Sequence, residues 1–285
     1  MFRALNSSVA PAAPMSTRPI ERTKPAPPLV PAVERAVRLL DHLAGLRSPQ
    51  PQAELSRTLG LPKSSLHGLL RTLVALGVAA RNERGEYALG ARALQWASAF
   101  ERQSDVVAAF HALASRVSAL GEETIMLAVL HDADVQYLAC RPGTRALAVN
   151  FRVGGRFPAH CTSTGKAMLA TLPAERVRAL LGRGALPRLT RRSVGSVAAL
   201  MRQLDDCRQR GYTVDDEEMA EGMHCFGAPV FAAGRDEAVA AVAVSLIKAS
   251  TTPRRRDEAI AAIGELAALI SERLGARPAP IRTSP

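Results

Sequence analysis

The stretch Leu59-Gly-Leu-Pro-Lys-Ser-Ser-Leu-His-Gly-Leu-Leu-Arg-Thr-Leu73 decides the fold of the first part of the chain. Gly60 permits the left-handed backbone that ends a short helix over 51–59, and Pro62 suits the first turn of the next helix. In that second helix the leucines recur at helical spacing and form one buried stripe: Leu66, Leu69, Leu70, Leu73 and Leu76. Two helices joined by a tight glycine turn predict a helix-turn-helix.

The opposite face of the second helix is small, polar and basic. It has no carboxylate and no large apolar side chain, and such a face suits the major groove of double-stranded DNA. The ordinary alternative is a small helical domain with an exposed basic face, because charge on a solvated helix is common. From this face we predict the DNA-contacting residues Lys63, Ser64, Ser65, His67 and Arg71.

A hairpin is predicted directly after these helices. Beyond Gly77 apolar residues recur at every second position, which is typical of strands, so we predict strands over 78–81 and 86–89. Gly85 supplies the positive φ that a tight turn between them needs. Arg81 and Arg84 would place charge at the tip of this hairpin, within reach of a phosphate or the minor groove. With an apolar helical stripe over 33–44, the segment 30–90 predicts a winged helix-turn-helix domain.

The composition fits two domains and an anionic partner. The chain has 285 residues, 47% of them hydrophobic, and a formal net charge of +11. The length suits two domains, and the charge favours nucleic acid. Four cysteines without a Cys-x-x-Cys pair argue against a disulfide framework or zinc ribbon and fit a reducing cytoplasm. No apolar run approaches the ~20 residues of a membrane span, so we expect a cytoplasmic protein with no membrane partner.

The rest of the chain predicts a linker and a second, α+β domain. Residues 1–29 contain six prolines and read as a disordered arm, and 276–285 as a flexible tail. A linker helix over 91–104 carries Trp96 and Phe100 one turn apart, to pack on a second subunit or on 106–120.

The domain over 105–275 is expected to begin with a helix over 106–120 and to continue with strands and helices in this order: strands 123–130, 134–140 and 146–153, helices 164–172, 173–181 and 197–209, strands 211–214, 225–231 and 239–247, and a helix over 253–274. This α+β pattern favours a mostly antiparallel sheet that faces a pocket and argues against a doubly wound nucleotide fold.

The segment 154–166 contains the first group of residues that could carry chemistry. A phosphate-binding loop fails on spacing, because His160 and Ala167 stand where that motif needs glycine and a hydroxyl. What remains are Ser163, Thr164 and Gly165 at the mouth of a helix, where amides and the helix dipole favour an anion such as a carboxylate. The alternative is an ordinary Ser/Thr helix cap.

The segment 211–225 contains the second group. We expect Asp215 at a strand end to point into the pocket, and Glu217 and Glu218 to face water. The dipeptides His160-Cys161 and His224-Cys225 suggest a soft-metal site, but adjacent strand residues point to opposite faces, so we assign no metal and no cofactor. No nucleophile, base and orienting group are assembled, so an enzyme is not predicted.

Several motifs taken together are similar to the IclR family of bacterial transcription regulators. They are Leu61-Pro-Lys-Ser-Ser-Leu-His67, Leu73-Val-Ala-Leu-Gly77, Val153-Gly-Gly-Arg-Phe-Pro-Ala-His160, Thr164-Gly-Lys-Ala-Met-Leu-Ala170, Asp215-Asp-Glu-Glu218 and Ala228-Pro-Val-Phe231. The resemblance implies a winged helix-turn-helix, a linker helix and a GAF-like effector-binding domain. It also implies homodimers or homotetramers that bind operator DNA and respond to a small organic acid.

Carried over by position, the resemblance implies a set of effector contacts: Ser163, Thr164, Asp215, Met223, Cys225, Ala243 and Ser245. Gly165 joins them through the helix-mouth argument. The favoured interpretation is a regulator of a catabolic operon that senses an aromatic or hydroxylated carboxylate. The alternative is a thiol- or metal-responsive sensor that uses the same DNA-binding domain.

Overall fold

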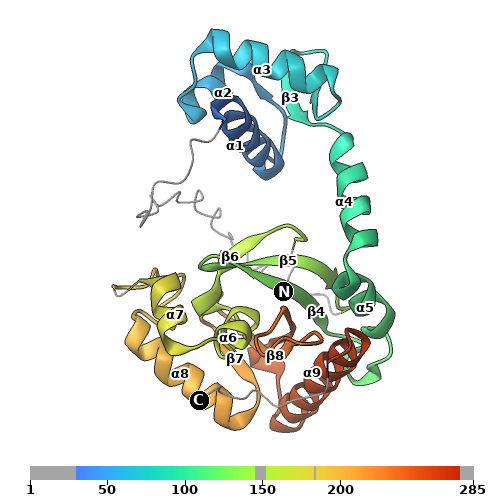
Figure 1. The fold of residues 1–285 in the computed structure, drawn as a ribbon, viewed down its shortest axis with the longest axis vertical. Coiled ribbons are helices and arrows are strands. Elements are labelled where there is room, and N and C mark those ends of the chain that lie inside the picture. Colours follow the sequence, from blue (N-terminus) through green and yellow to red (C-terminus); the bar gives the residue numbers. More distant parts are fainter. Residues whose placement is uncertain (1–29, 145–151, 183, 277–285) are drawn as a thin grey trace, which may run out of the picture. The chain divides into compact units, whose positions relative to one another are not determined.

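The computed structural model describes residues 30–144, 152–182 and 184–276 (Figure 1). The chain divides into two compact units, Met1–Trp96 and Ala97–Pro285. The boundary falls within helix α4 (Arg92–Gln103). Unit 1 has one hydrophobic core, and unit 2 has one core on each face of its sheet.

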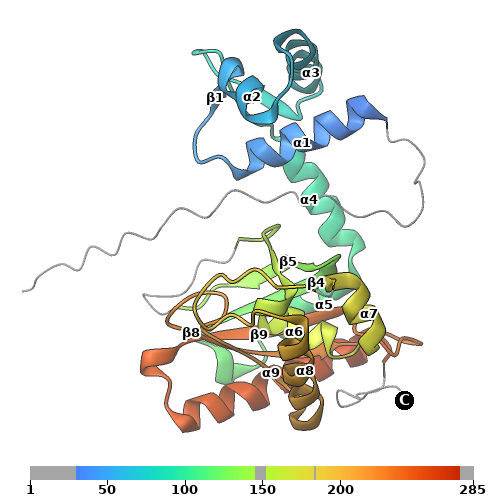
Figure 2. The same ribbon diagram turned by 90° about the vertical axis from the view of Figure 1, so that its left-hand side faces the viewer.

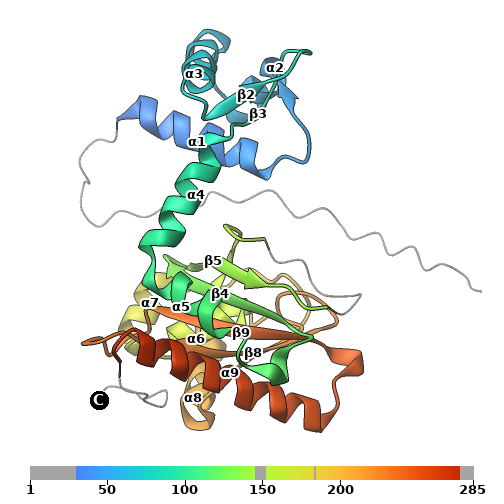
Figure 3. The same cartoon turned by 90° about the vertical axis from the view of Figure 1, so that its right-hand side faces the viewer.

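Unit 1 is a winged helix-turn-helix, as predicted. Its elements are α1 (Pro31–Gly45), β1 (Gln50–Pro51), α2 (Gln52–Leu59), α3 (Lys63–Ala75), β2 (Ala79–Arg81) and β3 (Glu86–Leu89). Gly60 ends α2 with a φ of 65°, and Leu66, Leu70 and Leu73 of α3 are buried. The strands form an antiparallel sheet in the order β1-β3-β2, and the β2–β3 hairpin lies beside α3 (Figure 3).

Unit 2 has the predicted α+β fold. Its elements after α4 are α5 (Asp105–Leu113), η1 (Ser118–Leu120), β4 (Thr124–His131), β5 (Asp134–Arg141), β6 (Arg156–Pro158), η2 (Ala159–Cys161), α6 (Ser163–Leu169), α7 (Ala174–Leu181), α8 (Val197–Arg210), β7 (Thr213–Asp216), β8 (Met223–Val230), β9 (Ala240–Ile247), η3 (Lys248–Ser250) and α9 (Pro253–Arg273). The six strands pair antiparallel in the order β6-β5-β4-β9-β8-β7.

Helices cover both faces of this sheet (Figures 2 and 3). Because strand side chains alternate, Val242 and Val244 of β9 join the core under α5 and α9. Ala241 and Ala243 join the core formed with α6, α7 and α8. Every residue of α6 is buried, so this short helix lies inside the unit, against β4, β7, β8 and β9.

Two sequence predictions for unit 2 differ from the structure. The helix expected over 106–120 ends at Leu113, and a turn and η1 follow. The guanidinium of Arg141 donates to the carbonyl oxygens of Ala114, Leu120 and Glu123, so polar contacts replace helical hydrogen bonds there. The strand expected over 146–153 lies mostly outside the described residues, and the third strand observed is β6 at 156–158, paired with β5.

None of the helices in the described ranges is long and apolar enough to cross a membrane.

Candidate functional site

The face of α3 that the sequence assigned to DNA is open to solvent. Lys63, Ser64, Ser65, His67 and Arg71 are all exposed, while the leucines of the same helix face the core of unit 1. The structure therefore presents one continuous polar and basic helix face, which is the arrangement that a recognition helix needs.

Gln52 in α2 supports this face, and the sequence analysis missed it. Its Nε2 donates to the carbonyl oxygen of Lys63 over 3.0 Å, and its Oε1 lies 3.4 Å from Nδ1 of His67. One side chain thus ties α2 to the start of α3 and restrains His67. A lone glutamine at a helix start carries no sequence signal for such a role.

The hairpin tip is held in a defined shape. Asn82 Oδ1 accepts hydrogen bonds from the backbone nitrogens of Arg84 and Glu86, at 3.1 and 2.9 Å. Arg81 and Arg84 are exposed, and the Arg81 guanidinium lies 5.7 Å from the centre of the Tyr87 ring. The predicted basic wing is therefore available to a partner.

In unit 2 the sheet register gathers the predicted effector residues beneath α6. Asp215, Cys225 and Ser245 are direct neighbours on β7, β8 and β9, so their side chains share one face. The Cys225 thiol donates to Ser245 Oγ over 3.4 Å. Met223 lies two residues before Cys225 on β8, and Ala243 lies two residues before Ser245 on β9, so both share the same face of the sheet. All five residues are buried.

The start of α6 supplies the remaining predicted contacts, with one correction. Ser163 and Thr164 are buried at its first turn. The amide of Gly165, which the sequence assigned to the ligand, donates instead to Thr162 Oγ1 over 3.1 Å. A Cβ on Gly165 would lie 2.2 Å from the carbonyl oxygen of Ala159, so glycine is needed for close packing on η2.

Asp215 is the acid at the centre of this site. It is 1% exposed, and its Oδ1 accepts hydrogen bonds from the backbone nitrogens of Glu218 at 2.8 Å and Met219 at 3.2 Å. Burial raises the pKa of the Asp215 carboxyl to about 6, although the Lys166 ammonium and both hydrogen bonds act in the opposite direction. Asp215 therefore changes charge close to neutral pH.

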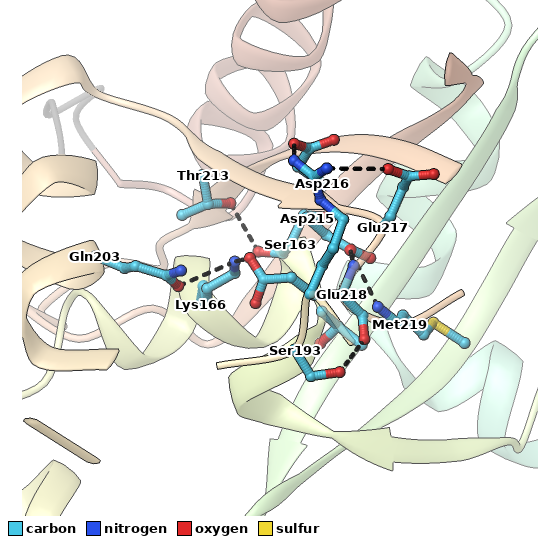
Figure 4. Close-up of polar contacts among 12 residues, drawn as sticks. Ser163, Lys166, Ser193, Gln203, Thr213, Asp215, Asp216, Glu217, Glu218 and Met219 are labelled. Carbon is cyan, nitrogen blue, oxygen red and sulfur yellow. Dashed lines mark hydrogen bonds and ion pairs between the residues drawn. The ribbon is translucent and has the colours of Figure 1, made fainter. Parts of the chain in front are cut away.

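The prediction that Glu218 faces water is wrong. Glu218 is 5% exposed, and its Oε1 lies 2.6 Å from Nζ of the buried Lys166 (Figure 4). Lys166 Nζ also donates to Gln203 Oε1 over 3.3 Å. The backbone reverses at Glu217, whose φ is 60°, and this reversal turns Glu218 inward. The available sequence signal was Lys166 itself, a lysine in a helix of small and apolar residues that needs a carboxylate partner when buried.

Two hydroxyls from the loop after α7 hold this turn in place. Ser193 Oγ donates to the carbonyl oxygen of Glu218, and Thr190 Oγ1 donates to that of Glu217, both over 2.6 Å. On the outer side of the turn, Lys248 Nζ lies 2.6 Å from carboxylate oxygens of Asp216 and Glu217. The turn that presents Asp215 is thus fixed from both sides.

Tyr137 on β5 also reaches the site and was not among the predicted residues. Burial raises the pKa of its phenol, and the nearby Cys225 and Asp215 raise it further, while the Thr164 hydroxyl opposes the rise. Its position on the α6 face follows from the strand alternation, but no feature of the sequence favours it over its neighbours.

The geometry does not support the thiol or metal alternative. Burial raises the pKa of the Cys161 thiol to about 12 and that of Cys225 well above its usual value, which disfavours the reactive thiolate. The centre of the His224 ring lies 4.5 Å from the centre of the Phe226 ring, and Phe226 belongs to the core on the other face of the sheet. His160 Nε2 lies 2.8 Å from the Pro187 carbonyl oxygen. Within the described ranges, no three His, Cys, Asp or Glu side chains are grouped to hold a metal ion.

Comparisons with known proteins agree with both units. The IclR helix-turn-helix domain matches residues 32–83, and the family described as "Bacterial transcriptional regulator IclR C-terminal" matches residues 98–272. The transcriptional repressor IclR of Escherichia coli (strain K12) is 33% identical over 234 residues, which are 80% of this chain and 84% of that protein. The acetate operon repressor of Salmonella typhimurium (strain LT2) is 31% identical over 234 residues, 80% of this chain and 84% of that protein.

A solved structure shows the same fold. It is an IclR homolog from Microbacterium hydrocarbonoxydans complexed with 4-hydroxybenzoate, with a TM-score of 0.73 and 24% sequence identity. The match covers 86% of this chain and 99% of that one.

Proposed function

Because this chain belongs to the IclR family of ligand-responsive, DNA-binding transcription regulators, we propose that it senses a small organic acid and controls a catabolic operon. Like the other members of its family, it is a transcription regulator and not an enzyme. The observation that carries the proposal is the buried polar row of Asp215, Cys225 and Ser245 beneath α6, in a different unit from the exposed basic face of α3.

The proposed effector contacts surround this row. They are Ser163, Thr164, Asp215, Met223, Cys225, Ala243 and Ser245, to which the structure adds Tyr137. This set combines apolar and polar side chains, which suits a ligand with an apolar body and a few polar substituents. The 4-hydroxybenzoate complex of the Microbacterium homolog supports an aromatic hydroxy acid as the first candidate class.

Isothermal calorimetry tests the effector class. We expect binding of at least one acid from a panel of 4-hydroxybenzoate, benzoate, lactate and pyruvate, and no binding of the matching neutral amides. Asp215→Ala should reduce the preference for hydroxylated acids by about 10- to 100-fold, the range of one hydrogen bond to a charged group. Its affinity for DNA should stay unchanged. Tight binding of an amide with no response to its acid would contradict the proposal.

Mobility shifts across a salt series test the proposed recognition face. Arg71→Ala and His67→Ala should both weaken operator binding, because their side chains are exposed on the groove-facing side of α3. If Arg71 reads a base edge, the loss should be about 1 to 3 kcal/mol and confined to specific sequences. If Arg71 contacts a phosphate, the affinity for all DNA sequences should fall alike, and the slope of log affinity against log salt concentration should decrease by about one. Arg202→Ala, which removes an exposed arginine of unit 2, is the matched control; equal affinity in all three variants would remove the assignment.

We further propose that the chain self-associates through α4. Trp96 and Phe100 are 53% and 50% exposed, and neither packs into a core of the described chain. Two aromatic rings one turn apart are a large apolar area to leave in water. Sedimentation of a Trp96→Ala, Phe100→Ala double variant should give a smaller assembly than wild type, whereas Leu189→Ala, at another exposed apolar residue, should not. A folded double variant of wild-type mass would show that α4 does not hold the oligomer.

A further inference from the structure

Ionisable groups from five elements surround the Asp215 carboxyl. They are Lys166 on α6, Glu218 on the turn after β7, Cys225 on β8, Tyr137 on β5 and Cys161 on η2. The pKa values of Tyr137, Cys161 and Cys225 are all raised by burial, so these three groups are neutral near pH 7. The charges that remain in the cluster are one ammonium and two carboxylates.

The ammonium is already engaged. Lys166 Nζ lies 2.6 Å from Glu218 Oε1 and donates to Gln203 Oε1 over 3.3 Å (Figure 4). The side chains of Lys166 and Glu218 are 2% and 7% exposed, so water does not screen the pair. Among the described residues Lys166 therefore forms its ion pair with Glu218, and it acts on Asp215 only as a more distant charge.

The cluster leaves a donor as well as acceptors for a ligand, because the buried Thr164 hydroxyl has no hydrogen-bond partner among the described residues. Glu218 Oε2 is buried and has no hydrogen-bond partner among the described residues. The backbone amides of Glu218 and Met219 both donate to Asp215 Oδ1, so Oδ2 is the oxygen that remains for a ligand. A ligand carboxylate can accept from the Thr164 hydroxyl, but it also meets the carboxylate oxygens of Asp215 and Glu218, which repel it unless one of these groups takes up a proton.

From this arrangement we propose that an acid effector binds with uptake of one proton from solvent, and that Asp215 carries this proton in the complex. The inference rests on the acid effector proposed above. Without this proton, the carboxylates of the ligand, Asp215 and Glu218 would share a buried site with one ammonium, that of Lys166. Neighbouring carboxylates in a buried site do not all stay ionised. Once protonated, Asp215 donates to the ligand instead of repelling it.

The sign of the pH effect follows directly. Burial raises the pKa of Asp215 to about 6, so in the free protein it is mostly protonated at pH 5.5 and mostly ionised at pH 7.5. The acids of the panel have pKa values below about 5 and are mostly anions throughout this range. Proton uptake should therefore be about one quarter at pH 5.5 and near one at pH 7.5. Affinity should be flat below pH 6 and fall about tenfold per pH unit above it.

Calorimetry on the full chain measures this uptake. The four acids of the panel are titrated between pH 5.5 and 8.0, each in two buffers of different ionisation heat. Asp215→Asn keeps an oxygen for the two backbone amides but cannot titrate, so its affinity should not change with pH and its uptake should be zero. Asp257→Asn is the matched control: this carboxylate pairs with Arg256 at 2.9 Å on the exposed surface of α9, and the variant should keep an uptake near one at pH 7.5.

The outcomes separate the two proposals. Binding without proton uptake at pH 7.5, or with equal affinity at pH 6 and pH 8, overturns the proton and leaves the acid effector standing. Uptake that persists in Asp215→Asn assigns the proton to another group and overturns the role of Asp215. If no acid of the panel binds at any pH, the acid effector itself is refuted, and the proton uptake with it.

Discussion

Lys166→Met is expected to lower the free energy of unfolding by about 3 to 5 kcal/mol, the cost of leaving one buried charge without its partner. Lys166 is 1% exposed, and its ammonium lies 2.6 Å from a carboxylate oxygen of Glu218. Methionine has nearly the same shape but no charge, so Glu218 would have to stay buried without a cation, take up a proton or move out. Each of these outcomes costs stability.

Urea unfolding followed by circular dichroism measures the loss. Arg254→Met is the matched control, because this arginine is 90% exposed and pairs with Glu258 at the surface of α9, so its removal should change stability little. The double variant Lys166→Met, Glu218→Leu should recover most of the stability, since it removes both charges together. Equal losses in the single and double variants would show that the two side chains do not act as a pair.

The Lys166–Glu218 pair also borders the proposed effector site. Glu218 belongs to the same turn whose backbone amides donate to Asp215, so moving Glu218 would disturb the acid that we propose to face the effector. In the double variant the turn keeps its contacts with Ser193 and Thr190. Stability recovered without recovery of acid binding would therefore assign a positioning role to the ion pair.

The sequence was sufficient for unit 1 because its structure is set by local signals. Glycines at helix ends, the leucine stripe and a two-residue period predict its helices and the β2–β3 hairpin nearly at their observed bounds, whereas the two-residue strand β1 was not predicted. The same signals found most elements of unit 2. They failed at 114–120, where the side chain of Arg141, distant in sequence, replaces helical hydrogen bonds. Local periodicity cannot report such a contact.

The candidate site was predictable only in part. Asp215 was predicted from its place at a strand end, and Cys225 and Ser245 came from the resemblance. Antiparallel pairing explains why the three residues meet. The Lys166–Glu218 pair joins residues 52 positions apart, and a run of four consecutive acids contains no reason to bury one of them. The reversal that buries Glu218 needs a positive φ at Glu217, a residue type that rarely adopts it, so neither composition nor turn preference predicts it.

Gly165→Ala is the second change for which we expect a large effect, a loss of about 3 kcal/mol in the free energy of unfolding. The added Cβ would lie 2.2 Å from the carbonyl oxygen and 2.4 Å from the Cα of Ala159. Both atoms are backbone, and α6 is buried on all sides, so neither segment can move away cheaply. The better helix propensity of alanine, worth about 1 kcal/mol, does not offset this overlap.

Gly264→Ala in α9 is the matched control, because that glycine is also helical but is exposed, and a Cβ added there would meet no atom within 4 Å. It should gain about 0.5 to 1 kcal/mol from propensity alone. Thermal or urea unfolding of both variants therefore separates packing from propensity. Since Ser163 and Thr164 move with α6, Gly165→Ala should also weaken acid binding even where the protein stays folded. If Gly165→Ala matched the stability of wild type, the close packing of α6 on η2 would not be the reason for a glycine at this position.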